Sequence, residues 1–357
     1  MADGGVVRRP AVPPPVRVRR DVTKLADNDP IITFYERAIE KMQEGDRLDL
    51  PTSWRYQAAI HDYPPENVTG VNERKNFPQR GDPNAKSSDI LPSTADRRKF
   101  WGQCQHHCWF FLPWHRAYLH FFEKIIMKIV AAMPGGPTDW ALPYWNYSRT
   151  ADSARLPSAF RNPTIPDVTR PGKTKNNHLF VSQRIAAANN GSLFLSAADI
   201  SVNCLKVTPF ANSGSSFGGA RINHHSFIGG GPEGELENAP HDAVHGAIGG
   251  ASGFMGGFVT APLDPIFWLH HCNIDRLWEV WVQRQKQRGV LNRNPNPLTD
   301  PLAADKTSDQ QWLDLPFDFH DADGNPVTMA SKEVMNTRIA PLSYEYEDTD
   351  DPFKGAA

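Results

Sequence analysis

The stretch Asp264-Pro-Ile-Phe-Trp-Leu-His-His-Cys-Asn-Ile-Asp275 decides the fold of this chain. Asp264 is a preferred helix cap, and Pro265 suits the first helical turn that follows. Apolar side chains then recur at helical spacing and would form the inner face: Ile266, Leu269, Ile274, Leu277, Trp278 and Trp281. The pattern predicts a long buried helix over residues 265–289 that carries His271 into the core.

A second long helix is predicted over residues 110–133. Pro113 fits its first turn, and Pro134-Gly135-Gly136 ends it. Its buried face would again be apolar: Leu119, Phe122, Ile125, Ile126, Ile129 and Val130. Two shorter amphipathic segments, residues 30–45 and 55–61, are also predicted to be helices, and the first follows a capping aspartate.

Proline, glycine and polar residues dominate two long segments, residues 64–92 and 148–234. We expect loops there, with short strands in the second, because loops this long inside a domain usually form functional walls or lids. The predicted fold is therefore mainly α, with long loops and a few short strands. We expect one domain over residues 22–346, between a flexible N-terminal arm (1–21) and a short tail (347–357).

Composition excludes several classes of function. The 38 basic and 40 acidic residues leave a net charge of -2, which attracts neither nucleic acid nor an anionic membrane. No apolar run approaches the roughly 18 residues that a membrane helix needs. The arginine-rich N-terminus is not followed by an apolar segment of the signal-peptide type, so a cytoplasmic location is favoured, with export on a partner as the alternative.

Histidines gather in two stretches of the chain. His241 and His245 are four residues apart, so both rings would lie on one helix face, and His271 can complete a set of three. His106 and His115 are too far apart in sequence to share a face, so a loop must bring them together. Their expected third partner is His61, at the end of a predicted helix.

Other residues of these stretches are expected to have roles other than direct metal ligation. His270 neighbours His271 but points about 100° away on a helix, which favours packing or an indirect role. The chain has four cysteines, three of them inside the histidine stretches. That placement favours reduced thiols, or chemistry at a metal, over structural disulfides.

Six neutral imidazoles indicate a metal centre. Imidazole suits copper, zinc, iron or nickel, and two sets of three can hold two metal ions face to face. A structural zinc site is disfavoured because such sites usually recruit cysteine thiolates. A catalytic three-histidine zinc site, and with it a hydrolase, stays open on spacing alone.

Both histidine stretches resemble sequence motifs of a known family. The stretch Phe111-Leu-Pro-Trp-His-Arg-Ala-Tyr-Leu-His-Phe-Phe-Glu123, behind His106, resembles the first copper signature of tyrosinases and polyphenol oxidases, and residues 264–275 resemble the second. The resemblance covers roughly residues 32–346. It implies a type-3 dinuclear copper centre in a four-helix bundle. By resemblance one copper is held by His61, His106 and His115, and the other by His241, His245 and His271.

The resemblance also implies an activity. The two copper ions would use dioxygen as co-substrate to oxidise small o-diphenols to o-quinones, and true tyrosinases also hydroxylate monophenols. Alternatives on the same centre are an o-aminophenol oxidase and a hemocyanin-like oxygen carrier. The resemblance implies neither a nucleic-acid nor a membrane partner, and the sequence does not predict the oligomeric state.

Four further residues receive roles from the resemblance. Cys104 matches the cysteine that forms a thioether with the histidine at His106 in fungal-type members. Glu237 matches a glutamate that holds a water near the coppers. Phe258 matches the gate residue above the second copper. Asp275, one turn after His271, would orient a ligand imidazole.

The chain also departs from the family pattern. Asp242 stands where many tyrosinases have asparagine, and it could act as a base or simply add negative charge. Gly246 stands where some bacterial enzymes place an arginine that steers the substrate. Tyr344-Glu-Tyr346 resembles the motif that closes the catalytic core. Only residues 347–357 follow, without the C-terminal capping domain of latent members, so we expect either an active chain or a shortened form.

Overall fold

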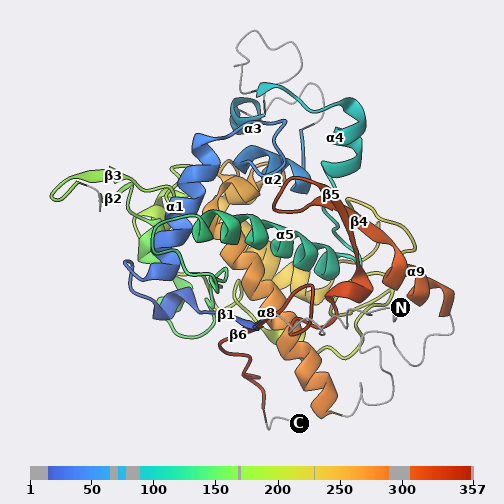
Figure 1. The fold of residues 1–357 in the computed structure, drawn as a ribbon. Helices are drawn as coiled ribbons and strands as arrows, with labels where there is room; N and C mark the ends of the chain where they lie inside the picture. The colour runs from blue at the N-terminus through green and yellow to red at the C-terminus, as the bar shows by residue number, and fades with distance from the viewer. Residues whose placement is uncertain are drawn as a thin grey trace, which may run out of the picture.

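Two long helices lie in contact at the centre of the molecule, α5 (Phe111–Ala131) and α8 (Pro265–Gln287) (Figure 1). The structure is a computed structural model, and it describes residues 15–64, 71–77, 89–167, 170–228, 230–288 and 306–354. The side chain of Asp264 caps α8 by accepting a hydrogen bond from the backbone N–H of Ile266 at 3.1 Å. Almost every residue of α8 up to Val282 is buried, so this helix packs on all sides. Both helices were predicted, with ends within two residues of those observed.

Two further helices extend this central layer. α1 (Pro30–Glu44) packs on α5, and α2 (Trp54–His61) packs on α1. Asp29 caps α1 as expected, through a hydrogen bond of 2.9 Å to the backbone N–H of Ile31. Both helices were predicted, and the mainly α fold class is confirmed.

Shorter elements were only partly predicted. The additional helices are α3 (Val71–Asn76), α4 (Thr94–Phe100), α6 (Ala186–Asn189), α7 (Ala243–Gly249) and α9 (Lys306–Asp314). The segment 64–92 was predicted to be loop throughout, and α3 corrects this for residues 71–76; residues 65–70 and 78–88 lie outside the described part. Residues 148–234 are mostly loop, as expected.

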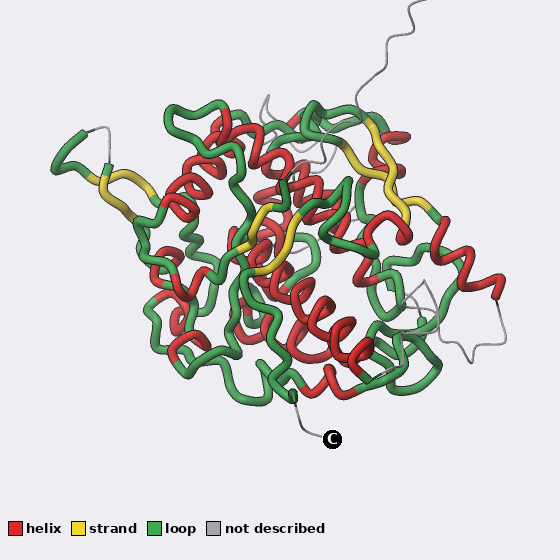
Figure 2. The backbone as a smooth tube through the Cα atoms, turned by 60° about the horizontal axis from the view of Figure 1, so that its bottom comes forward, coloured by secondary structure: helices red, strands yellow, loops and turns green. Residues whose placement is uncertain are grey.

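In the described part of the chain, three two-stranded sheets accompany the helices (Figure 2). β2 (Thr164–Pro166) and β3 (Thr174–Asn176) are antiparallel and project from the body of the molecule. β4 (Pro316–His320) and β5 (Pro326–Ala330) form an antiparallel hairpin that packs on α5 through β4. Among the described residues, no helix is long and apolar enough to span a membrane.

The third sheet joins the two ends of the described chain. β1 (Arg17–Arg19) pairs in parallel with β6 (Tyr344–Tyr346). The predicted flexible arm over residues 1–21 is therefore wrong for this part: Arg17 and Arg19 are buried, while residues 1–14 lie outside the described chain. The physical reason is that buried acidic partners neutralise both arginines, which composition alone does not reveal.

Candidate metal centre

Three histidines from three separate segments meet in the first cluster. His61 is the last residue of α2, His106 lies in the loop before α5, and His115 lies in the first turns of α5. All three are buried. Their ring centroids are 5.8 Å apart for His61–His106, 5.7 Å for His61–His115 and 5.6 Å for His106–His115. This near-equilateral arrangement is the one that three rings around a common ion would have.

A second cluster is formed by His241, His245 and His271. The first two lie on consecutive turns of a π-helical segment (η6, Glu237–Asp242) and of α7, and the third lies on α8. Ring centroids are 4.7 Å apart for His241–His245, 4.9 Å for His241–His271 and 5.5 Å for His245–His271. The helix-face prediction for His241 and His245 thus agrees with the geometry.

The two clusters face one another. The rings of His115 and His271 stack at 4.6 Å with an interplanar angle of 13°, and the rings of His106 and His241 are 5.8 Å apart. The structure therefore brings together all six histidines that the sequence singled out, five of them buried and His245 partly buried.

Hydrogen bonds restrain the Nδ1 atom of nearly every ring. His61 Nδ1 donates to the carbonyl of Phe258 at 2.9 Å. His115 Nδ1 donates to the carbonyl of Phe111, and His245 Nδ1 to that of Met255, both at 2.8 Å. Because a carbonyl only accepts, these rings carry their proton on Nδ1, which leaves Nε2 free to bind a metal.

Carboxylates hold two more rings. His241 Nδ1 lies 2.7 Å from Asp242 Oδ1, and His106 Nδ1 lies 2.7 Å from Glu237 Oε1. His241 Nε2 is buried and has no hydrogen-bond partner among the described residues. A buried nitrogen without a partner is costly unless a ligand uses it. The donor set and its orientation therefore fit two metal ions.

Burial keeps the imidazoles neutral. It lowers the pKa of His106 and of His245 to about 4. The pKa values of His61, His115, His241 and His271 are lowered well below the ordinary value, first by burial and then by neighbouring histidines. Because neutral imidazole is the form that binds metal, the protein holds its donors ready for metal at physiological pH.

His270 belongs to the second cluster as a fourth ring. One of its nitrogens lies within 4.8 Å of the donor atoms of the other three histidines, and neither nitrogen has a hydrogen-bond partner among the described residues. The ring stacks on His241 at 5.6 Å. The packing role favoured by the sequence is compatible with this position, but its closeness to the donors was not predicted.

Cys104 points into the first cluster. Its Sγ lies 2.9 Å from His106 Nε2 and 3.4 Å from His115 Nε2. All four cysteines fall within the described residues and are buried and free, as expected. Burial raises the pKa of the Cys104 thiol well above its ordinary value. The thiol therefore lies beside the ring to which the thioether prediction assigns it.

Glu237 lies under the first cluster. Beyond its contact with His106, its carboxyl oxygens accept hydrogen bonds from the backbone N–H of His107 at 3.0 and 3.1 Å. Burial raises the pKa of Glu237 to about 8. Glu237, His107 and Glu233 form a third group of potential metal donors, which the sequence did not indicate. Glu237 is thus a buried carboxyl placed next to a candidate ligand.

A cavity of about 200 Å³ opens onto both clusters. This is smaller than the roughly 300 Å³ at the low end of drug-sized sites, so it suits a molecule with one ring. Phe258 stands at its edge with 42% of its surface exposed, and its ring lies 4.8 Å from that of His106 and 6.4 Å from that of His61. Asp242 lines the same cavity. Asp242 thus lies where a polar residue at the site was expected. Phe258 was expected above the second copper, but its ring lies beside two histidines of the first cluster, so its gate role stays a prediction.

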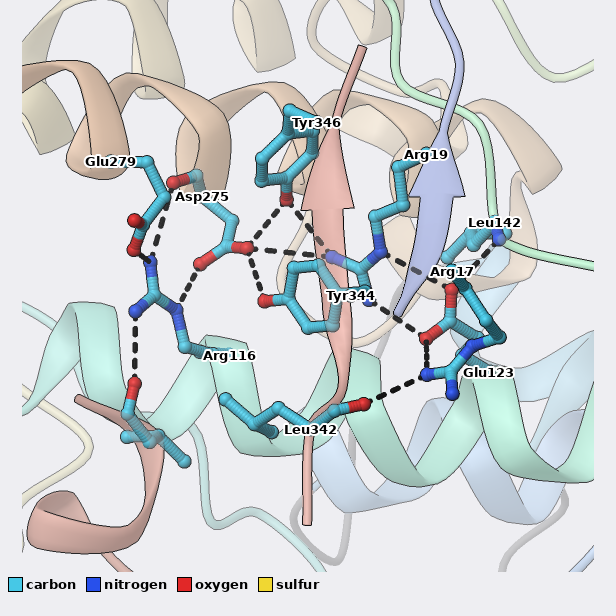
Figure 3. Close-up of polar contacts among 11 residues, drawn as sticks. Arg17, Arg19, Arg116, Glu123, Leu142, Asp275, Glu279, Leu342, Tyr344 and Tyr346 are labelled. Carbon is cyan, nitrogen blue, oxygen red and sulfur yellow. Dashed lines mark hydrogen bonds and ion pairs between the residues drawn. The ribbon is translucent and has the colours of Figure 1, made fainter. Parts of the chain in front are cut away.

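Asp275 has another role than the one predicted. Its Oδ1 accepts a hydrogen bond from Arg116, and its Oδ2 accepts hydrogen bonds from Tyr344 at 2.6 Å and Tyr346 at 2.5 Å (Figure 3). Arg19 adds an ion pair at 3.4 Å. Both oxygens of Asp275 are therefore occupied, and His271 Nδ1 is left without a hydrogen-bond partner among the described residues. The expected orientation of a ligand imidazole by Asp275 is replaced by a structural role.

Comparison with known proteins agrees with this geometry. Residues 51–284 match the family described as the common central domain of tyrosinase, and residues 306–356 match the polyphenol oxidase middle domain. The chain is 38% identical over 338 residues to the tyrosinase HcTyr1 of Hahella sp. (strain CCB-MM4), covering 93% of this chain and 63% of that protein. It is 29% identical over 259 residues to a chloroplastic polyphenol oxidase of Malus domestica, covering 70% of this chain and 39% of the relative.

Solved structures share the fold. Latent apple tyrosinase superimposes with a TM-score of 0.63 and 24% identity, covering 96% of this chain and 65% of that chain. Grenache (Vitis vinifera) polyphenol oxidase does so with a TM-score of 0.61 and 24% identity, covering 98% and 94%. Because the tyrosinase domain matches well over half of the sequence, the chain belongs to the tyrosinase and polyphenol oxidase family. That family is one of type-3 dinuclear copper proteins, which use dioxygen as co-substrate.

Proposed function

We propose that this chain is a copper-dependent phenol oxidase that converts o-diphenols to o-quinones with dioxygen. One observation carries the proposal: two sets of three neutral imidazoles face one another, five of the six are buried and His245 is partly buried, and five of the six rings are held through Nδ1. Family membership supports it. The chain spans 63% of the length of the Hahella tyrosinase, so the activity of that protein is an inference for this one.

The six histidines are the proposed copper ligands. His61, His106 and His115 would hold one ion, and His241, His245 and His271 the other. Copper bound by these residues would supply the redox chemistry through which dioxygen oxidises the phenol. An all-imidazole donor set suits this task because it is neutral and stabilises copper in its two oxidation states.

Side chains around the ligands have proposed tasks of their own. Glu237 would orient His106 and hold a water. The charge of bound copper would lower the raised pKa of this buried carboxyl, and the ionised group could then receive a proton from the incoming phenol. Phe258 would stack on the substrate ring and limit its bulk. Asp242 would keep His241 oriented through the contact of 2.7 Å between Oδ1 and Nδ1.

Cys104 is proposed to form a thioether with the His106 ring. The S–C bond would replace one hydrogen on sulfur and one on a ring carbon, and the two electrons released would pass to dioxygen. The bond would fix the ring against rotation. The intact mass of the copper-loaded protein should therefore lie two hydrogens below the mass calculated from its sequence, whereas the Cys104→Ser variant should match its own calculated mass. A copper-loaded protein that also matches its calculated mass would overturn the thioether.

Metal analysis combined with oxygen uptake tests the function. We expect two copper ions per chain and oxygen consumption with catechol, accompanied by quinone absorbance. Tyramine and o-aminophenol, measured side by side, would reveal monophenol hydroxylation and aminophenol oxidation. Zinc in place of copper, or oxygen binding without any quinone, would overturn the proposal in favour of a hydrolase or an oxygen carrier.

A further inference from the structure

The mouth of the cavity carries negative charge. Twelve residues line the cavity, and Asp242 is the one acidic residue among them. Neither lysine nor arginine lines this cavity within the described part of the chain. A charged group on an incoming molecule would therefore meet a carboxylate first.

Asp242 is held in place with its charge toward solvent. Its Oδ1 accepts the hydrogen bond from His241 at 2.7 Å, while 47% of the side chain remains exposed. The His241 ring on the inner side is 3% exposed. The carboxylate thus sits at the boundary between the buried donors and water, where its field acts on whatever extends out of the cavity.

Glu73 brings a second carboxylate close to the cavity, beside Gly257. A methyl group built on Gly257, which lines the cavity next to Phe258, would lie 4.0 Å from Glu73 Oε1. Glu73 belongs to α3, far from Asp242 in sequence. Within the described residues, neither carboxylate is paired with a lysine or an arginine. The two charges therefore add at the mouth.

The shape of the substrate decides which group meets these charges. The two hydroxyls of a catechol must reach the histidine clusters at the bottom, so a substituent opposite them extends outward past Phe258. Metal charge at the bottom acts on the hydroxyls of every catechol alike. The charge of the outward substituent is what distinguishes one catechol from another, and it lies nearer to the carboxylates.

We propose that this site selects phenols with a cationic, ammonium-bearing side chain over phenols with a carboxylate. The proposal rests on the phenol oxidase function and names its substrate class. Unit charges several ångströms apart at a solvated surface change binding by a few-fold each. Attraction of an ammonium and repulsion of a carboxylate together give an expected ratio of about tenfold, which salt should reduce.

The test compares three catechols on the copper-loaded enzyme. Dopamine, 4-methylcatechol and dihydrocaffeate carry a cationic, a neutral and an anionic substituent, each insulated from the ring by saturated carbon. We expect kcat/KM to fall in that order, with a ratio of about tenfold between the first and the last at low salt. Binding measured by calorimetry without dioxygen, where no turnover occurs, should show the same order of Kd values.

Variants separate charge from hydrogen bonding. Asp242→Asn removes the charge but keeps an oxygen for His241, and we expect the dopamine to dihydrocaffeate ratio to fall about fivefold. Asp242→Glu keeps the charge and should retain the preference. Glu73→Gln should lower the ratio about twofold. Each ratio is taken within one variant, so a change in overall activity cancels.

The outcomes are distinct. Equal kcat/KM values for dopamine and dihydrocaffeate, with 4-methylcatechol oxidised normally, would overturn the selectivity and leave the oxidase function intact. An unchanged ratio in Asp242→Asn would overturn the assignment to Asp242. Failure to oxidise any of the three by the wild-type, copper-loaded chain would overturn both proposals together.

Discussion

Five of the six imidazoles are held through Nδ1, each by a different group, and the sixth is held by packing. His115 is bonded to a carbonyl of its own helix, one turn back at Phe111. His271 has an Nδ1 without a partner among the described residues, so its direction comes from packing against Phe267, 4.2 Å away, and His115. Each ring supplies its own donor nitrogen, although His270 lies within reach of the second cluster and Cys104 within reach of the first.

Removing one ring should therefore empty one position. We expect His115→Ala and His271→Ala each to lower the copper content from two ions per chain toward one, and each to abolish phenol oxidation. Metal analysis of the folded variants, with circular dichroism as the control for folding, checks this. Full copper content together with wild-type turnover in either variant would remove that histidine from the ligand set.

At the scale of elements, the loop over residues 254–258 connects both clusters. The carbonyl of Met255 holds His245 of the second cluster, and the carbonyl of Phe258 holds His61 of the first. Glycines allow this loop to pack tightly: a Cβ on Gly256 would lie 2.0 Å from the carbonyl oxygen of Gly250. The gate residue and two ligand orientations thus depend on one tightly packed turn.

Gly256→Ala should disturb both clusters at once. Because the added methyl meets backbone rather than a flexible side chain, the loop must shift, at a cost of about 1–3 kcal/mol. We expect a lower unfolding midpoint and fewer than two copper ions per chain. Gly246→Ala is the matched control, since a Cβ there has nothing within 4 Å. Equal thermal midpoints and copper contents in the two variants would show that the loop does not position the rings.

At the scale of the whole molecule, a buried charge network joins the two ends of the described chain (Figure 3). Arg17 and Arg19 on β1 both contact Glu123 of α5, at 3.2 and 3.1 Å. Burial alone would raise the pKa of Glu123, but the two arginines outweigh it and lower the pKa to about 2. Arg19 also reaches Asp275 on α8. The strand pair therefore holds the two central helices together.

Breaking this network should cost much more than breaking a surface pair. Arg19→Met leaves buried carboxylates without a partner, and we expect a loss of about 3–5 kcal/mol in the free energy of unfolding. Arg338→Met removes the exposed pair with Glu345, whose side chains are 69% and 36% accessible, and should cost at most about 1 kcal/mol. Urea unfolding followed by tryptophan fluorescence measures both. Similar losses of unfolding free energy in the two variants would contradict the stabilising role of the buried charge network.

Acid should destabilise the copper-free chain as a whole. Burial lowers the pKa of His106 and His245 to about 4 in the folded chain, whereas histidine in an unfolded chain titrates at about 6.5. Between these values the unfolded chain binds protons that the folded chain does not, so stability decreases as pH falls below about 6.5. At about pH 5 one such histidine would cost about 2 kcal/mol. Urea midpoints that stay equal between neutral pH and this pH would contradict the prediction.

Local sequence signals were sufficient for the long helices and for the histidine sets. Asp264 caps α8 and Asp29 caps α1 as predicted, because a cap acts within one turn of its own helix. The hairpin of β4 and β5 was not predicted, and neither was strand β1. Strand β1 depends on β6, more than three hundred positions away, which no local pattern contains. The hairpin closes over a local turn with Gly324 at positive φ, a signal that the sequence interpretation missed.

Hydrogen-bond partners of ring nitrogens that are distant in sequence could not be predicted from local signals. His61 is bonded to the carbonyl of Phe258, 197 positions away, and every residue of the chain has a carbonyl. Asp275 was expected to hold an imidazole because it lies one turn after His271. Its oxygens go instead to Arg116 and to the two tyrosines of β6, which compete for them more strongly.

By itself, the sequence determined which side chains carry the chemistry of this protein and on which helices most of them lie, because capping residues and apolar periodicity act over a few residues. Only the tertiary structure decided how the six rings are turned, where the carboxylates stand at the cavity mouth and why the N-terminal strand is buried. The orientation of His61 and His106 and the burial of the N-terminal strand depend on hydrogen bonds and ion pairs between segments more than a hundred positions apart, which form only once the chain has folded.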